Sequence, residues 1–308
     1  MIKENFLSKI YQRNGDSLYF GAYPQTEVSD SGLISALNNS VDALPTPKKG
    51  GEWTSYGYYV SGMAKDCMWY VDKEYEGKRY RGVYFTSYRS DDTTSASCVD
   101  NSRQYDNGYA LCKVYWFKFE PIKWQIVGEK EGKALLCSHL ILDSQEFNSS
   151  LEPEGLTYPN AWEHSTIRRW LNESFFDLAF SGEEKSVIVP SDLDNKLTAR
   201  TNEDGLNRYA TTQNDTTDNL FLLSYSDLKK LACDSATLRK SITDYARIQG
   251  VSTSTDPLCP GKGWWWLRSP FCLNGTFTSY VTHNGNLTFN SKVNLTCNGV
   301  VPALTIKI

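Results

Sequence analysis

Histidine is scarce in this 308-residue chain, and its scarcity restricts the catalytic chemistry that we can expect. A Ser or Cys nucleophile commonly needs a histidine beside it as a base. His139 follows a predicted strand, His164 lies near the start of a predicted helix, and His283 lies in a segment near the C-terminus. The sequence also lacks a P-loop, a G-x-G-x-x-G motif and an H-E-x-x-H motif. We therefore expect a protein that is not an enzyme.

Long apolar runs and an excess of basic residues are missing as well. No run approaches the roughly 20 apolar residues that span a bilayer, and residues 1–7 lack the apolar core of a secretory signal. The net charge of -4 gives no general footprint for nucleic acid. We expect neither membrane insertion nor nucleic-acid binding. A cytoplasmic location is the default, with phage-borne or leaderless surface display as alternatives.

Metal-binding patterns are not evident either. The eight cysteines include no pair at C-x-x-C spacing, so a structural zinc site is not indicated. Their even number permits disulfides, but we favour free thiols in a chain of this size without a leader. The acidic stretch at residues 191–195 lacks the spacing of an EF-hand loop, and we interpret it as a solvated loop. We predict no cofactor and no bound metal.

The segment at residues 271–298 has an unusual composition for this chain. Lys292 is its only charged residue, whereas 22% of the whole chain is charged. Asn and Thr recur throughout, with Phe, Tyr, Leu, Cys and His placed among them without periodicity. Rigid aromatic residues mixed with small polar residues are typical of a paratope. The simpler alternative is an Asn/Thr-rich surface of ordinary hairpins. We favour a binding surface for a variable macromolecular ligand, most simply a protein.

The residue types in this segment also follow a pattern of the genetic code. Phe, Cys, Leu, Asn, Gly, Thr, Ser, Tyr, Val and His are all reached from an Asn codon by changes in its first two bases, and only Lys292 breaks the rule. Adenine-directed mutagenesis of a template rich in Asn codons would leave this pattern. A neutral Asn/Thr-rich segment would also pass this test fairly often, so the pattern agrees with diversification without establishing it.

Periodicity and turn residues predict a series of short elements. Ser165 is a plausible N-cap for the clearest helix, which carries Arg168 and Arg169; we expect these arginines to form structural ion pairs rather than clamp a ligand. The other predictions are a strand at 18–24; a helix around 33–37; a hairpin from 68–71 and 80–85; a loop at 90–108; a strand pair within 115–127 that bends at Pro121; a hairpin turn at 129–132; helices capped by Ser181 and Ser226; a strand at 219–224; a helix at 238–246; and turns at Asn284-Gly285 and Asn298-Gly299.

Five motifs follow one another from residue 19 to the C-terminal end: Tyr19-Phe20-Gly21-Ala22-Tyr23-Pro24-Gln25, Phe119-Glu120-Pro121-Ile122-Lys123-Trp124, Ser165-Thr166-Ile167-Arg168-Arg169-Trp170-Leu171-Asn172, Trp266-Leu267-Arg268-Ser269-Pro270 and Gly299-Val300-Val301-Pro302-Ala303-Leu304. In this order they resemble a bacterial uncharacterised-domain family. Many members of that family are variable proteins of diversity-generating retroelements. One departure is Val301, where the family usually has Arg.

The resemblance implies a fold and a domain organisation. We expect an α+β protein with a C-type-lectin fold of the formylglycine-generating-enzyme type, built from mixed short strands and hairpins with two or more helices. Residues 1–308 would form a single domain. Within it, residues 1–17 are a lead-in, residues 45–108 are an insert, and residues 264–308 carry the variable region.

The resemblance further implies that the segment after Trp-Leu-Arg-Ser-Pro is a diversified ligand-binding surface. Trp264, Trp265, Trp266, Arg268, Val281, Val293 and Pro302 are assigned to the scaffold, and Gly285 and Gly299 to the turns. The expected ligand-binding residues are Phe271, Cys272, Leu273, Asn274, Thr276, Phe277, Ser279, Tyr280, Thr282, His283, Asn284, Asn286, Thr288, Phe289, Asn290, Asn294, Thr296, Cys297 and Asn298.

Two alternatives on the same fold remain open. An oxidase resembling the formylglycine-generating enzymes would need a copper-binding cysteine pair, for which only Cys272 and Cys297 lie in the right region. A sugar-binding lectin of fixed specificity would use calcium. Its Glu-Pro-Asn or Gln-Pro-Asp signature is missing, because Glu152-Pro153 is followed by Glu154.

Overall fold

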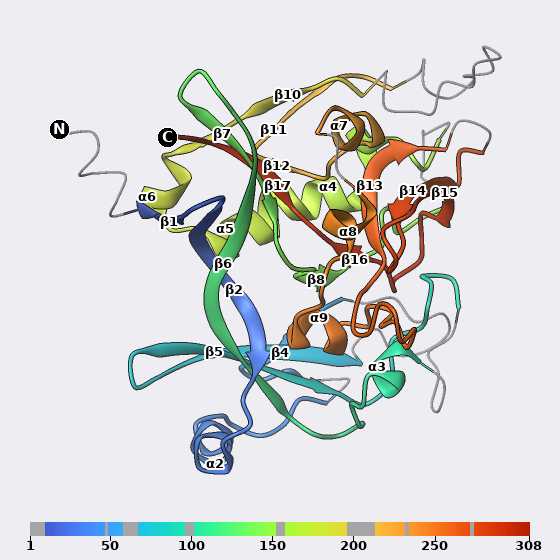
Figure 1. Ribbon diagram of the computed structural model, residues 1–308. Helices are drawn as coiled ribbons and strands as arrows, with labels where there is room; N and C mark the ends of the chain where they lie inside the picture. Colours follow the sequence, from blue (N-terminus) through green and yellow to red (C-terminus); the bar gives the residue numbers. More distant parts are fainter. Residues whose placement is uncertain are drawn as a thin grey trace, which may run out of the picture.

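The computed structural model shows a strand-rich, mixed α+β protein, which confirms the predicted class (Figure 1). It describes residues 10–46, 49–57, 67–95, 102–151, 158–195, 213–231, 234–271 and 274–308. Its larger sheet has the order β12-β17-β7-β6-β5-β4-β3, with β1, β2 and β9 paired beside this path. Its strands are β1 (Gln12–Asn14), β2 (Ser17–Glu27), β3 (Thr54–Ser55), β4 (Met68–Tyr75), β5 (Lys78–Phe85), β6 (Tyr115–Lys130), β7 (Lys133–Ser138), β9 (Ile188–Val189), β12 (Leu220–Phe221) and β17 (Ala303–Lys307).

Strand β6 runs without a break through Pro121, so the predicted pair of strands bent at this proline is wrong. One edge of β6 pairs with β5 from Tyr115 to Lys118 and with β7 from Trp124 to Lys130. Pro121 lies between these two stretches and faces Ala22 of β2 across the other edge. Proline has no N–H to donate, and it is tolerated in a strand where no ladder bond is required.

Residues from the predicted insert at 45–108 form part of the larger sheet. β4 and β5 make the predicted hairpin, and β5 continues the sheet onto β6. The hairpin turn uses Glu76 and Gly77, both at positive φ (50° and 70°), which matches the right-handed twist of the strands. This end of the sheet has its own buried cluster, which includes Trp53, Trp69 and Trp116. Helix α2 (Ser31–Asn39) adds Leu37 to that cluster.

The smaller main sheet has the order β15-β14-β13-β16-β8 and lies to the right of β6 in Figure 1. Its strands are β8 (Asp143–Ser144), β13 (Trp265–Pro270), β14 (Phe277–Val281), β15 (Leu287–Lys292) and β16 (Gly299–Val300). A separate ribbon pairs β10 (Ser191–Leu193) with β11 (Thr216–Asp218). The predicted turn at Asn298-Gly299 is wrong, because Gly299 belongs to β16, where it pairs in parallel with Trp265. A Cβ at Gly299 would clash with Ile141, so close packing explains this glycine.

The longest helical stretch follows Ser165, whose side chain accepts from the Arg168 N–H as predicted. It consists of α4 (Thr166–Trp170), a π-helical turn η2 (Leu171–Phe175) and α5 (Phe176–Ala179). Arg168 pairs with the buried Asp218 at 2.7 Å, in agreement with a structural role. The remaining helices are η1 (Trp162–His164), α3 (Arg103–Asp106), α6 (Gly182–Lys185), α7 (Tyr225–Lys230), α8 (Ser235–Leu238) and α9 (Asp244–Ile248).

Two helix predictions need correction. Ser224, not Ser226, caps α7, and it forms a capping box with Asp227. The single helix predicted at 238–246 is two helices, because the chain between α8 and α9 makes strand-like bridges from Ser241 to Lys262 and from Ile242 to Ile141. No helix in the described ranges is long and apolar enough to cross a membrane.

Candidate functional site

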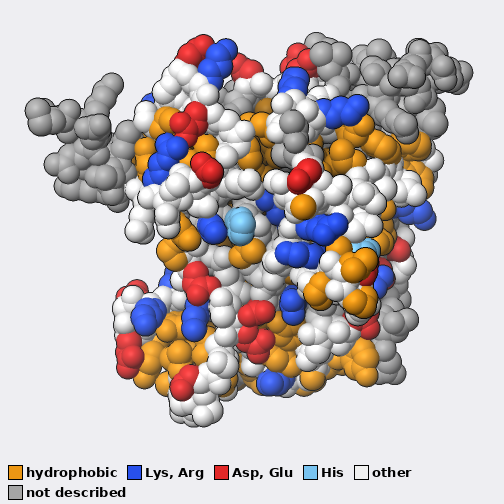
Figure 2. Space-filling view, in the orientation of Figure 1, with side chains coloured by type: hydrophobic (Ala, Val, Ile, Leu, Met, Phe, Trp, Pro, Cys, Tyr) orange, Lys and Arg blue, Asp and Glu red, His pale blue; other side chains and the backbone are white. Residues whose placement is uncertain are grey.

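The predicted binding segment forms the β14–β15 hairpin at one edge of the smaller sheet, together with the loops beside it. Twelve of the predicted contact residues keep exposed or half-exposed side chains there, and we call them the hairpin surface: Phe271, Asn274, Thr276, Phe277, Tyr280, Thr282, His283, Asn284, Asn286, Thr288, Phe289 and Asn290. Figure 2 shows mainly hydrophobic and neutral polar side chains over this part of the molecule.

Buried side chains fix the backbone beneath this surface. Trp265, Trp266, Val281 and Val293 are each 0% exposed, as predicted for the scaffold. Trp265 pairs with Val281, and Trp266 pairs with Tyr280, across the β13–β14 ladder. Because these side chains are fully buried in a close-packed interior, they resist movement of the hairpin. The strands beneath the surface are therefore fixed chiefly by buried residues rather than by the surface side chains.

A buried asparagine holds the turn that leads into the hairpin. The Asn160 side chain is 0% exposed, and its Nδ2 donates to the carbonyl oxygens of Phe271, Asn274 and Phe277 at 3.3, 3.2 and 2.7 Å. Its backbone N–H donates to Gly275 at 2.9 Å. These bonds bridge more than 110 residues of sequence and satisfy carbonyl groups at the turn.

Replacement of Asn160 by alanine is expected to destabilise this turn. Loss of the amide removes three buried hydrogen bonds, although each carbonyl oxygen keeps a backbone N–H donor, and we expect a cost of about 1–3 kcal/mol. Urea denaturation measures the change in the free energy of unfolding, and hydrogen exchange of the 274–277 amides reports the local effect. Asn274→Ala is the matched control, because the exposed Asn274 side chain accepts only from Thr276, two residues away. Equal effects of the two substitutions would contradict a special role for Asn160.

The hairpin turns at Asn284-Gly285 as predicted, but its loop has three residues, 283–285, rather than two, because the Thr282 N–H donates to the Asn286 carbonyl. Gly285 has φ of 85°, a conformation that favours glycine. The Thr282 hydroxyl donates to Asn284 Oδ1 at 2.5 Å, and the Asn286 N–H donates to the Thr282 hydroxyl at 3.1 Å. Arg239, from outside the hairpin, donates to the Asn284 carbonyl at 3.1 Å. The tip is thus held from within and from a neighbouring loop.

Aromatic rings form two groups on this surface. The Trp264 ring stacks on His283, with a centroid separation of 6.5 Å, and tilts against Tyr280 at 5.6 Å. Its Nε1 donates to His283 Nδ1 at 2.9 Å, which places the neutral ring's proton on Nε2. At the other strand, Phe289 packs against Tyr225 of α7 at 5.3 Å. Sequence reasoning missed Tyr225 and Arg239, because no local signal links them to residues so distant in the chain.

Five predicted contact residues are buried instead: Ser279, Asn294, Thr296, Cys297 and Asn298. Backbone and side-chain hydrogen bonds hold the segment 294–298 in the interior. The Thr296 hydroxyl donates to the Ser90 carbonyl at 2.5 Å, and the Asn298 amide donates to the Ser291 hydroxyl at 2.7 Å. In this conformation these five side chains cannot touch a macromolecular ligand, and we leave them out of the hairpin surface. Cys272 and Leu273 lie outside the described residues.

Nothing in the described part of the chain forms a group of three or more His, Cys, Asp or Glu side chains suited to a metal ion. Burial, followed by the charge of Asp91, raises the pKa of the Cys297 thiol to about 11. A thiol that stays protonated is a poor metal ligand and a poor nucleophile. Cys67, Cys112, Cys137, Cys259 and Cys297 are free thiols, in line with our expectation for these five. Glu152-Pro153-Glu154 lies outside the described residues.

Comparison with known protein families gives one match, which covers more than half of the chain. Residues 131–308 match a domain of unknown function, DUF6273. The chain belongs to this family. The DUF6273 region begins at the turn between β6 and β7 and contains both β8 and the whole β13–β17 segment. No curated protein and no solved structure matches the chain.

The DUF6273 match includes three of the five motifs, those at Ser165–Asn172, Trp266–Pro270 and Gly299–Leu304, and it includes the hairpin surface. The motifs around Tyr19 and Phe119, and the strands β1 to β5, precede it. The two regions are nevertheless continuous in the larger sheet, since β6 pairs with β7 from Trp124 to Lys130.

Proposed function

We propose that this DUF6273 protein is a non-enzymatic binding protein with a C-type-lectin fold, whose hairpin surface is diversified by a retroelement to recognise varied ligands, chiefly proteins. The observation that carries this proposal is the separation of roles along residues 264–293. The side chains that fix the backbone, such as Trp266 and Val281, are fully buried, whereas the twelve residues of the hairpin surface are not. Variation at most of those twelve positions therefore costs the fold little, and Thr282 and Asn284, whose side chains hold the tip, are the exceptions.

The chemistry of the surface suits protein recognition. Aromatic rings such as those of Tyr280 and Phe289 provide area at a low cost in side-chain entropy, and the neighbouring Asn and Thr groups provide adaptable hydrogen bonds. The surface carries no Asp, Glu, Lys or Arg of its own, which removes the desolvation cost of those charged groups. The codon pattern and the resemblance to variable proteins support diversification as the source of its sequence.

Simultaneous replacement of exposed positions tests the division of roles. We expect Asn274→Ser, Asn286→Ser and Asn290→Ser together to lower the free energy of unfolding by less than about 1.5 kcal/mol, because these side chains are exposed and surface changes cost about 0.5 kcal/mol each. Val281→Ala alone is expected to cost more, about 2 kcal/mol, because it leaves a cavity in the core. Urea denaturation of both variants decides this point. A greater cost for the triple variant would contradict a freely variable surface.

Two further measurements test recognition and diversification separately. A display library randomised at the twelve surface positions should yield protein binders, whereas one randomised at the five buried positions should yield mainly unfolded chains. The native locus should contain a reverse-transcriptase gene and a near-copy of the DNA for 271–298 with adenines at the variable codons. Absence of both genetic features would overturn diversification but leave binding standing.

A further inference from the structure

A second concave site lies outside the hairpin surface. Two cavities, of about 610 and 590 Å³, adjoin each other and share Tyr56, Gln145, Trp170 and Ser174 in their walls. We call the combined space the Asp143 cleft. None of the twelve residues of the hairpin surface lines it. Each cavity is of the size that accommodates a small molecule or a long side chain.

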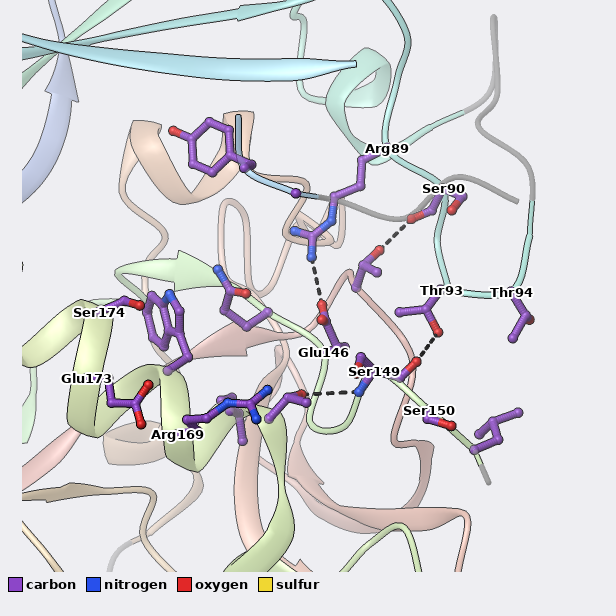
Figure 3. Close-up of a pocket in the computed structure, with 18 residues that line it drawn as sticks. Arg89, Ser90, Thr93, Thr94, Glu146, Ser149, Ser150, Arg169, Glu173 and Ser174 are labelled. Atoms are coloured by element: carbon purple, nitrogen blue, oxygen red, sulfur yellow. Dashed lines mark hydrogen bonds and ion pairs between the residues drawn. The ribbon is translucent and has the colours of Figure 1, made fainter. Parts of the chain in front are cut away.

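The outer cavity of the cleft carries a balanced set of charges. Figure 3 shows Arg89 and Glu146 paired on one wall, at 3.0 Å, and Arg169, Glu173 and Ser174 on the opposite wall. The opposite wall comes from α4 and the π-helical turn η2, and single π-helical turns occur frequently at functional sites. Because both signs of charge are present, the outer cavity itself gives no preference for an anion or a cation.

The inner cavity contains a buried carboxyl group. Asp143 is 2% exposed and lines this cavity. Its oxygens accept from the Tyr23 hydroxyl, from the Ser144 N–H at 2.6 Å and from Gln145 Nε2 at 3.2 Å. Within the described ranges, no Lys, Arg or His nitrogen lies at ion-pair distance from it. A buried charge is ordinarily paired, so a carboxylate without a cation marks an incomplete site.

Nearby charged groups already have partners. Arg81 binds Asp72 through two nitrogens, at 2.7 and 2.8 Å, and its guanidinium lies 4.2 Å from the centre of the Tyr70 ring. Asp177, at the edge of the inner cavity, pairs with Lys185 at 2.6 Å. These pairs leave the charge of Asp143 without an ion-pair partner, and Arg89, whose charge lowers the Asp143 pKa, is itself paired with Glu146.

Aromatic rings line the cavity that contains this carboxyl group. Tyr23, Tyr56, Tyr70, Trp170, Phe175 and Tyr245 all line the inner cavity. Aromatic faces attract cations, and rings combined with a carboxylate are a recurrent site for ammonium groups. We propose that the Asp143 cleft binds the positively charged ammonium group of an organic amine, which pairs with Asp143 among these rings. The amine is either a free small molecule or the lysine side chain of a protein partner.

The protonation of Asp143 provides a signature of this pairing. Burial raises the pKa of Asp143 to about 6, although the Tyr23 hydroxyl and the Ser144 N–H counteract this. An ammonium group binds the ionised form, so binding should weaken as pH falls through about 6. The groups that face Asp143 are Tyr23 from β2, Tyr245 from α9, Arg81 from β5 and Arg89 from the loop after β5. None of these changes charge near that pH, because both tyrosine pKa values are raised and arginine stays protonated.

The test is a calorimetric titration of the full chain with n-butylammonium, choline, Nα-acetyl-lysine amide and neutral n-pentanol. We expect saturable binding of at least one ammonium compound at about pH 7.5, and weakening by about tenfold at about pH 5, where a carboxyl of pKa 6 is one-tenth ionised. Asp143→Asn should weaken binding at least tenfold. Asp192→Asn is the control and should not, because Asp192 is exposed on β10 and lines neither cavity of the cleft.

Each outcome separates the alternatives. Tighter binding of Nα-acetyl-lysine amide than of the other amines supports a partner's lysine, and the reverse order supports a free amine. Pentanol binding as tightly as butylammonium, or unchanged binding by Asp143→Asn, would overturn the proposal. If Asp143→Asn does not fold, the pH dependence of ammonium binding by the unmodified chain decides the question. An affinity that stays constant from about pH 5 to 7.5 would contradict the proposal. Failure here leaves the hairpin surface unaffected, since the two sites share no residue.

Discussion

Replacement of Trp266 by alanine is expected to lower the free energy of unfolding by about 3–5 kcal/mol. The side chain is 0% exposed, its ring lies 6.0 Å from that of Phe147, and its Nε1 donates to the Gln145 carbonyl at 2.7 Å. The substitution removes a large apolar contact and leaves that carbonyl without its donor. Urea denaturation measures this loss as a shift in the transition midpoint. Far-UV circular dichroism is the suitable probe, because it follows the backbone rather than the tryptophan that is replaced.

The neighbouring Trp264→Ala is the matched control for this effect. Trp264 is half-buried, and its ring contacts Tyr280 and His283 on the hairpin surface. Its loss removes one hydrogen bond and some ring contact, at a cost of about 1 kcal/mol. Trp266→Phe should lie between the two, because it retains most of the apolar area. If Trp264→Ala proves as costly as Trp266→Ala, the hairpin surface is not separable from its scaffold.

Local chemistry made several elements predictable from the sequence. Ser165 and Ser181 cap helices because their hydroxyl groups accept from N–H groups three residues later. The turns at Glu76-Gly77 and Asn284-Gly285 follow from backbone conformations that glycine favours. In each case the capping or turn residue lies within a few residues of the element that it determines, so a local sequence pattern is enough to predict that element.

Errors arose where distant segments decide the outcome. Pro121 does not break β6, because it lies between the stretches that pair with β5 and with β7. Gly299 looks like a turn residue beside Asn298, but it is a strand residue packed on Ile141. Pairing partners more than 30 residues away cannot be inferred from a local pattern.

The same distinction applies to the two candidate sites. The hairpin surface was predictable because its residues are contiguous and have an unusual composition, although composition could not show that Thr296 and Asn298 are buried. The Asp143 cleft was not predictable. Tyr23, Asp143 and Tyr245 come from β2, β8 and α9, and only the folded chain brings them together. No short motif marks a site of this kind.

Replacement of Arg268 by methionine is the second substitution with a large expected effect, about 3–5 kcal/mol. Arg268 is 3% exposed, and its Nη1 donates to Asp227 Oδ2 at 2.5 Å and to the Leu222 carbonyl at 2.8 Å. Methionine keeps most of the apolar stem but leaves Asp227 in a largely buried position without a cation. Asp227 also belongs to the capping box of α7, so the loss should extend to that helix.

The pH dependence of this loss has a definite sign. Burial acts to raise the pKa of Asp227, but Arg268 and the Ser224 N–H outweigh it and hold the pKa below its usual value. The stabilisation from this pair is therefore present above the unfolded-state pKa and is lost as pH falls through the folded-state pKa. The cost of Arg268→Met should be larger at about pH 7 than at about pH 4, because protonation of Asp227 in the variant relieves the unpaired charge.

Arg169→Met provides the control, since Arg169 is exposed on α4 and makes no ion pair within the described residues. It should change the free energy of unfolding by no more than about 0.5 kcal/mol at either pH. A cost for Arg268→Met that does not vary with pH would mean that packing on Phe221, 5.7 Å from its guanidinium, is the main contribution. In that case Arg268 would support the scaffold through the contacts of its guanidinium with the Phe221 ring and the Leu222 carbonyl rather than through Asp227, and Arg268→Lys would fail to restore stability.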